Sequence, residues 1–207
     1  MDEYVVRAAK FIRQWMAEHP GFNDLAEMYS DRHKGDRMYL SKALIGIQPW
    51  KHMSFIPDWA FYNCDELTNV DIPNNVTLIG SMAFMRCKNL ESVTLGEDII
   101  NIDSEAFRDC TNLKKIIIPD DVSVLRSRTF YNCKSLTDVT LGTGIRYLDE
   151  HIFYGCEKLS TINYKGTMEQ FNNIKKDDDW HELENPLGPG AFTYIKTVRC
   201  SDGVIDL

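Results

Sequence analysis

The sequence lacks the features that mark several large classes of protein. Within its 207 residues there is no run of about 18 apolar residues, so no membrane-spanning helix is predicted. Its 23 basic and 31 acidic residues give a net charge of −8, which disfavours binding to a phosphate backbone. There is no glycine-rich phosphate-binding loop and no Gly-x-Ser-x-Gly sequence, the markers of nucleotide-binding enzymes and of many serine hydrolases. We therefore expect neither a nucleic-acid partner nor catalytic residues.

Patterns typical of metal sites are missing as well. The chain has no Cys-x-x-Cys pair, and its five histidines have no spacing typical of metal ligands. The three consecutive aspartates at 177–179 do not match the ligand spacing of an EF-hand calcium loop. The sequence therefore predicts no metal and no cofactor.

What the sequence does contain is a strict internal repeat. Each unit has a phenylalanine, a cysteine three residues later and a leucine three residues after the cysteine. The cysteines stand 23 residues apart, at Cys64, Cys87, Cys110, Cys133 and Cys156. A fixed period of this length is typical of a solenoid, in which one supersecondary unit stacks on the next.

The residues after each leucine predict a strand and a corner. Apolar residues three and five positions after the leucine alternate with polar ones, as in a half-buried strand. Proline or glycine follows, at Pro73, Gly96, Pro119 and Gly142, and ends the strand. The piece that closes each unit, around the phenylalanine, has room for no more than about one or two helical turns.

The complete unit, L-x-x-V-x-I-P-x-x-V-x-x-I-x-x-x-A-F-x-x-C, resembles the BspA-like class of bacterial leucine-rich repeats. The tail extends the resemblance, since Tyr164-Lys165-Gly166-Thr167, Trp180 and Cys200-Ser201-Asp202-Gly203 match the segment that closes many such arrays. It departs from that segment in having Phe171 where a tryptophan is usual. The resemblance implies an α/β leucine-rich-repeat solenoid with a binding role and no chemistry.

The repeat register divides the chain into three parts. Residues 1–41 are expected to form a helical N-terminal cap, because the apolar residues between Tyr4 and Met16 follow helical spacing. Residues 42–163 form the array of about six parallel strands, in which 42–64 is a degenerate first repeat with Leu44 and Ile47 in register. Residues 164–207 are expected to form an α+β C-terminal cap, because the ends of a solenoid otherwise expose its core.

The repeated cysteines are interpreted as buried free thiols that fill the core. On successive rungs their side chains point in parallel, and disulfides need side chains that face each other. The first residues also lack the basic and apolar regions of a secretory signal. We expect a cytoplasmic protein, or a secreted or surface protein if the chain was trimmed or uses another export route.

Function is expected on the outward positions of the predicted strands, which do not contribute to core packing. These candidate partner-binding residues are Asn69, Asp71, Ser92, Thr94, Lys115, Ile117, Asp138, Thr140, Thr161 and Asn163. Ile117 is the apolar exception among polar neighbours. It either merely suits a strand or marks, with Lys115, the centre of a partner contact.

The array is acidic, with 10 basic and 16 acidic residues between 53 and 163. Such a charge could steer a basic protein partner, although solubility explains it equally. The favoured function is a non-catalytic protein–protein interaction module that uses the strand face. The alternative is a self-assembling structural protein or a surface adhesion protein. The sequence favours a monomer without fixing the oligomeric state.

Overall fold

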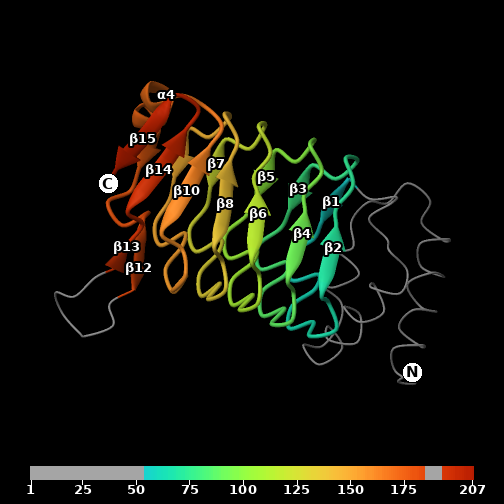
Figure 1. The fold of residues 1–207 in the computed structure, drawn as a ribbon. Coiled ribbons are helices and arrows are strands. Elements are labelled where there is room, and N and C mark those ends of the chain that lie inside the picture. Colours follow the sequence, from blue (N-terminus) through green and yellow to red (C-terminus); the bar gives the residue numbers. More distant parts are fainter. Residues whose placement is uncertain (1–53, 185–192) are drawn as a thin grey trace, which may run out of the picture.

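The fold is a stack of parallel coils, seen from the side in the computed structural model of Figure 1. The structure describes residues 54–184 and 193–207. Each coil carries a longer strand on one side and a shorter one on another, and successive coils pair in parallel at a 23-residue offset. The predicted parallel solenoid with this period is therefore confirmed.

The longer strands form a seven-stranded sheet, which we call the strand sheet. Its order is β15-β14-β10-β8-β6-β4-β2, and all pairs are parallel except β14 with β15. Five of its strands come from the repeats: β2 (Asn69–Asp71), β4 (Ser92–Thr94), β6 (Lys115–Ile117), β8 (Asp138–Leu141) and β10 (Thr161–Tyr164). β14 (Thr197–Cys200) and β15 (Gly203–Asp206) extend it beyond the last repeat. The sheet contains six parallel strands because β14 continues the direction of the repeats.

The shorter strands form a second, six-stranded parallel sheet, which the sequence pattern did not distinguish from a corner. Its strands are β1 (Phe55–Ile56), β3 (Leu78–Ile79), β5 (Asn101–Ile102), β7 (Val124–Leu125), β9 (Tyr147–Leu148) and β11 (Lys175–Lys176). Ile56 pairs with Ile79, so the described part of the degenerate first repeat follows the projected register. Leu44 and Ile47 lie outside the described residues.

The core runs through the centre of the coils as columns of identical side chains. The phenylalanine rings stack at centroid distances of 5.1 to 5.8 Å and are within 10° of parallel. This column consists of Phe61, Phe84, Phe107, Phe130 and Phe153. The repeated cysteines and leucines lie beside it, all buried. Because each coil buries its apolar side only against its neighbours, the stack is stabilised as a whole.

The segment around each phenylalanine forms turns and no helix in the described coils, within the predicted limit of one or two helical turns. Two residues in every coil have positive φ angles, for example Glu105 at 61° and Asp109 at 60°. This left-handed conformation interrupts a right-handed helix. Amides in this segment instead donate to the next coil, as Phe84 does to Ala106 at 2.8 Å.

The C-terminal segment closes the stack with a short helix and additional strands. Helix α4 (Met168–Asn172) begins at Thr167, whose side chain accepts a hydrogen bond from the amide of Gln170 in a capping box. Phe171 and Trp180 are buried, and their ring centroids are 6.0 Å apart, so they cover the last coil with aromatic surface. β12 (Glu182–Glu184) pairs with β13 (Thr193–Tyr194) in a separate two-stranded sheet.

The predicted helical N-terminal cap, residues 1–41, lies outside the described residues. Within 54–184 and 193–207, no helix is long and apolar enough to cross a membrane.

Candidate functional site

The outer surface of the strand sheet carries all ten predicted candidate residues. They project outward because the strands alternate, with a buried apolar residue between each pair. The six candidates on β2, β4 and β6 are exposed, whereas Asp138, Thr140, Thr161 and Asn163 are half-buried. The structure thus brings the ten residues together on one surface, which we call the strand face.

The C-terminal strands enlarge the strand face, a contribution that the repeat pattern did not reveal. Thr197 and Arg199 on β14 lie opposite Thr161 and Asn163 in the register. β15 adds Val204, whose side chain is 56% exposed, opposite Arg199. The 36-residue offset between Ile162 and Val198 differs from the repeat period, which is why the period alone could not place these residues.

The strand face divides into two rows, and the row at the start of the strands is linked by its own side chains. Ser92 Oγ donates to Asn69 Oδ1 at 2.6 Å. Lys115 Nζ lies 3.9 Å from Asp138 Oδ2, and the hydroxyls of Thr161 and Thr197 are 2.8 Å apart. These groups satisfy one another along the row, so a partner there would have to replace existing hydrogen bonds.

The row at the ends of the strands is less occupied. It contains Asp71, Thr94, Ile117, Thr140 and Asn163. Asn163 donates to Asp138 Oδ1 at 3.4 Å, whereas no side-chain hydrogen bond or ion pair joins the other four within the described ranges. Ile117 is 45% exposed at the centre of the array. This row therefore offers apolar surface and polar groups that are free to bind.

A hollow of about 640 Å³ lies beside this row, between the ends of β4 and β6 and the corners that follow them. Thr94, Lys115 and Ile117 line it from the strand face. The corners contribute the carboxylates of Glu97, Asp98, Asp120 and Asp121 and the ammonium group of Lys165. The hollow thus combines an exposed isoleucine with an acidic border.

The carboxylates at this border differ in their hydrogen bonds and ion pairs. Asp120 accepts from the amide of Thr143 at 2.9 Å and lies 3.1 Å from Lys165 Nζ. The hydrogen bond from Thr143, followed by the interaction with Lys165, lowers the pKa of Asp120. In the part of the chain that the structure describes, the carboxylates of Glu97, Asp98 and Asp121 have no ion-pair partner.

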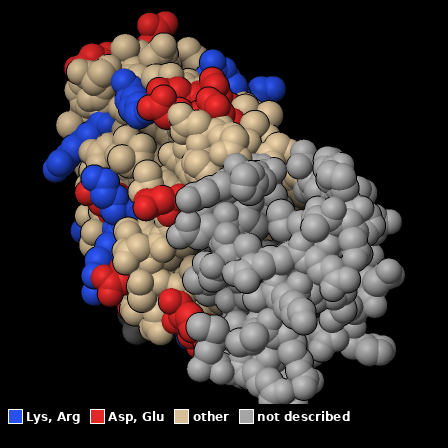
Figure 2. Space-filling view, turned by 90° about the vertical axis from the view of Figure 1, so that its right-hand side faces the viewer, with Lys and Arg blue, Asp and Glu red and all other residues tan. Residues whose placement is uncertain are grey.

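Elsewhere charges of both signs are interspersed. On the described part of the face in Figure 2, Lys and Arg side chains lie beside Asp and Glu. Two ion pairs join neighbouring coils of the array at 2.6 Å each, Lys114 with Glu91 and Lys134 with Glu157. Pairs of this kind neutralise the positive groups that a nucleic-acid surface would need.

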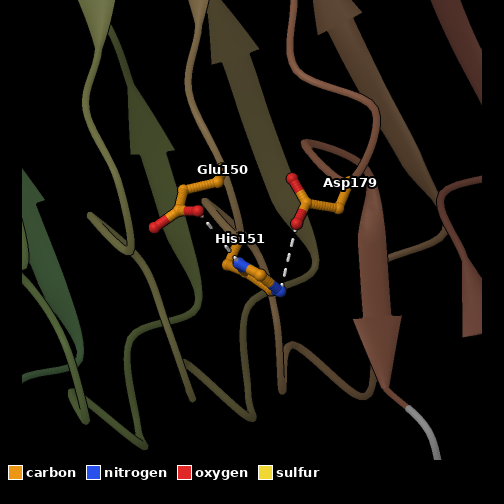
Figure 3. A group of neighbouring side chains, drawn as sticks. All are labelled: Glu150, His151 and Asp179. Atoms are coloured by element: carbon orange, nitrogen blue, oxygen red, sulfur yellow. Dashed lines mark ion pairs between the residues drawn. The ribbon is translucent and has the colours of Figure 1, made fainter.

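Glu150, His151 and Asp179 come together where the last repeat meets the C-terminal segment (Figure 3). His151 Nε2 is 3.2 Å from Asp179 Oδ2, and Nδ1 is 4.0 Å from Glu150 Oε2. One ligand atom from each residue lies within 4.8 Å of the others, so the group could hold a metal ion.

However, the two ring nitrogens of His151 face different carboxylates, and Glu150 also contacts Arg128 at 3.4 Å. This arrangement suits a link between the repeats and the cap better than ligands around one ion. The histidine spacing gave no signal of it because Asp179 is distant in sequence.

The thiols of the core offer no nucleophile. The five repeated cysteines are buried, and neither they nor Cys200 form a disulfide within the described residues, as predicted. Burial raises the pKa of the Cys87, Cys110, Cys133 and Cys156 thiols well above the usual range. A thiolate, the reactive form, is therefore strongly disfavoured at neutral pH.

Comparison with known families and structures agrees with the geometry. The family model of the BspA type leucine-rich repeat region matches residues 54–175 in six copies. No curated protein matches the sequence. The matches indicate leucine-rich repeat proteins and no catalytic family.

Solved structures with similar folds come from bacteria. A leucine-rich cell surface protein from Faecalibacterium prausnitzii A2-165 is 29% identical, with a TM-score of 0.58, over 61% of this chain and 33% of its own. The leucine-rich repeat protein of T. pallidum is 27% identical, with a TM-score of 0.53, over 60% of this chain and 62% of its own. The pneumococcal vaccine antigen PcpA, at 23% identity and a TM-score of 0.52, shares the fold. This chain thus spans about a third of the first structure and less than two thirds of the second.

Proposed function

Because this chain belongs to the BspA type leucine-rich repeat family, we propose that it is a non-catalytic module that binds a protein partner through the strand face. The observation that carries this proposal is the exposed Ile117 beside a 640 Å³ hollow in a row that its own side chains leave unlinked. An isolated apolar residue within a polar, rigid sheet is the kind of anchor that binding surfaces place near their centre.

The ten candidate residues of the strand face do not contribute equally in this proposal. Asp71, Thr94 and Ile117 contact the partner, since their row is free. Asn69, Ser92 and Lys115 lie in the linked row and mainly keep the surface rigid. A rigid surface favours binding because less conformational entropy is lost on association.

A surface or secreted location is part of the proposal. The similar structure from F. prausnitzii is described as a cell surface protein. The buried thiols suit this location as well as the cytoplasm, because they are shielded from oxidants. The cytoplasmic expectation rested on the first residues of the chain alone, so it carries less weight than the relative.

Self-assembly is the second candidate function, and one observation favours it. β15 lies at the edge of the strand sheet and carries the exposed Val204, with Leu207 48% exposed just beyond it. An open edge strand can pair with another chain. Light scattering across a concentration series separates the two functions, because a concentration-independent monomer contradicts assembly through this edge.

Site-specific photo-crosslinking tests partner binding. Benzoylphenylalanine is placed at Ile117 on the strand face or at Ile100, which is 56% exposed beside the second sheet. Each purified protein is irradiated in an extract of the source organism that contains its envelope fraction. We expect a discrete crosslinked partner from position 117 and none from position 100. Equal labelling from both positions, or none from 117, contradicts the proposal.

A further inference from the structure

We infer that the hollow beside Ile117 receives an extended segment of the partner protein in which a lysine or arginine stands next to an aliphatic side chain. This inference rests on the proposed function and specifies the chemistry of the partner. It follows from the position of the apolar and charged groups around the hollow.

The apolar part of the recognition is Ile117. At 45% exposure it leaves a substantial part of its side chain in water, and its neighbours in the row, Thr94 and Thr140, are small enough to leave it accessible. Covering this side chain with an aliphatic group of a partner removes apolar surface from water. Because the outward residues of neighbouring strands are polar, the gain is confined to one point of the face.

The charged part lies directly beside it. Glu97 and Asp98 follow β4, Asp121 follows β6, and all three are exposed residues that line the hollow. The two cations that also line it, Lys115 and Lys165, are each within 4.0 Å of another carboxylate, Asp138 and Asp120 respectively. Among the residues that the structure describes, the hollow is therefore left with three carboxylates that have no ion-pair partner. A partner cation is attracted there, and an acidic partner is repelled.

The size of the hollow agrees with a peptide segment. Its volume of about 640 Å³ exceeds that needed for one side chain and corresponds to a few residues of an extended chain. The parallel strands at its floor are about 4.8 Å apart, so side chains of an extended segment that crosses them can meet Ile117 and the corners of two coils. Aliphatic and basic groups on neighbouring residues of the partner then satisfy both parts of the site.

The experiment uses two hexapeptides that differ only in charge: acetyl-Lys-Thr-Lys-Val-Lys-Thr-amide and acetyl-Glu-Thr-Glu-Val-Glu-Thr-amide. Binding to the full chain is followed by NMR of isoleucine δ1 methyl groups. The Ile117 methyl reports on the hollow, and the exposed Ile100 methyl is the internal control. We expect the basic peptide to shift Ile117 and not Ile100, with a dissociation constant that rises several-fold between 50 and 300 mM salt because exposed charges are screened. The acidic peptide should leave both methyl groups unshifted.

Two double variants test the carboxylates. Asp98→Asn with Asp121→Asn removes two charges of the hollow and should weaken the basic peptide about five- to tenfold. Asp65→Asn with Asp178→Asn removes two exposed charges elsewhere and should change affinity less than about twofold. The inference is overturned if both peptides shift Ile117 alike, if neither does, or if the two double variants behave alike. None of these outcomes contradicts a partner crosslinked from position 117, so the proposed function can stand when this inference fails. If no partner is crosslinked from position 117, the proposed function itself is rejected.

Discussion

The thiol of Cys110 donates a hydrogen bond to the carbonyl oxygen of Phe84, one coil earlier, at 3.1 Å. The same oxygen accepts the amide of Cys87 at 3.1 Å, so both of its acceptor positions are used. Cys87, Cys133 and Cys156 make the equivalent thiol contact at 3.0 to 3.2 Å. The repeated cysteine therefore fills the core and also satisfies a buried carbonyl of the neighbouring coil, which explains why a small apolar residue such as alanine does not take its place.

Replacing Cys110 with alanine is expected to lower the free energy of unfolding by about 1–3 kcal/mol, since it opens a small cavity and leaves the Phe84 carbonyl with one donor. Cys200→Ala, at a half-buried position outside the core column, should cost less than about 0.5 kcal/mol. Urea unfolding followed by circular dichroism measures both. Equal losses for the two variants would show that the column position has no special role.

The same geometry predicts the reactivity of the thiols. In the native protein the five repeated cysteines should react with Ellman's reagent only on the timescale of unfolding, because burial raises the pKa of at least four of them and keeps the reagent out. After unfolding in guanidinium without reductant, all six thiols should titrate. A deficit of two or four thiols would mean that disulfides form, contrary to the free cysteines of the structure.

The strict repeat allowed the fold of the array to be predicted from the sequence. A 23-residue period fixed which residues lie inside, and outward positions such as Asn69 and Asp71 followed from strand alternation. The same period could not predict the turn conformation around the phenylalanines, because positive φ angles are adopted there by Met82, Arg86 and Glu105, which have no intrinsic preference for them. Pairing of successive coils imposes that conformation, and a local sequence pattern does not contain this information.

The candidate site was predictable only in part. Ile117 stood out in the sequence, and the structure places it at the hollow. The acidic border was missed because Glu97, Asp98 and Asp121 belong to corners, where a repeat pattern predicts only that the chain turns. Arg199 and Val204 were missed for a different reason, since they reach the strand face through a cap that breaks the period.

Gly142, at a corner of the repeats, and Gly203, at the start of β15, predict a second stability difference. A Cβ atom on Gly142 would lie 2.5 Å from the carbonyl oxygen of Pro119 in the preceding coil, and backbone cannot move aside easily. Gly142→Ala is therefore expected to cost about 2–3 kcal/mol. On Gly203 the nearest atoms would be the end of the flexible Met168 side chain at 2.9 Å. Gly203→Ala should cost less than half as much, and thermal unfolding of both variants tests the order.

The hydrogen bond of Tyr147 predicts a loss of stability at alkaline pH. Its hydroxyl donates to Asp177 Oδ1, and this hydrogen bond raises the pKa of Tyr147 to about 12. In the unfolded chain a tyrosine ionises near pH 10. The folded state therefore holds the proton more tightly, so the stabilisation is complete below about pH 10 and is lost as the pH rises from 10 to 12.

In an ultraviolet titration, the unaltered protein should show one tyrosinate that forms near pH 12. This component should be absent from the Tyr147→Phe variant. Asp177→Asn should move that component toward pH 10, because the accepting carboxylate is replaced by a neutral amide. A component that stays near pH 12 after this replacement would assign the raised pKa to another cause.

Two adjacent residues of β6 test whether the outward side chains of the strand face contribute to stability. Ile116 is fully buried and Ile117 is 45% exposed on the opposite side of the sheet. Ile117→Asp should change the free energy of unfolding by less than about 0.5 kcal/mol, because the carboxylate stays in water. Ile116→Asp should cost at least about 3 kcal/mol, because it places an unpaired charge in the core. Urea unfolding gives both values. A large loss for Ile117→Asp would mean that this side chain already packs against the protein and could not serve as a contact for a partner.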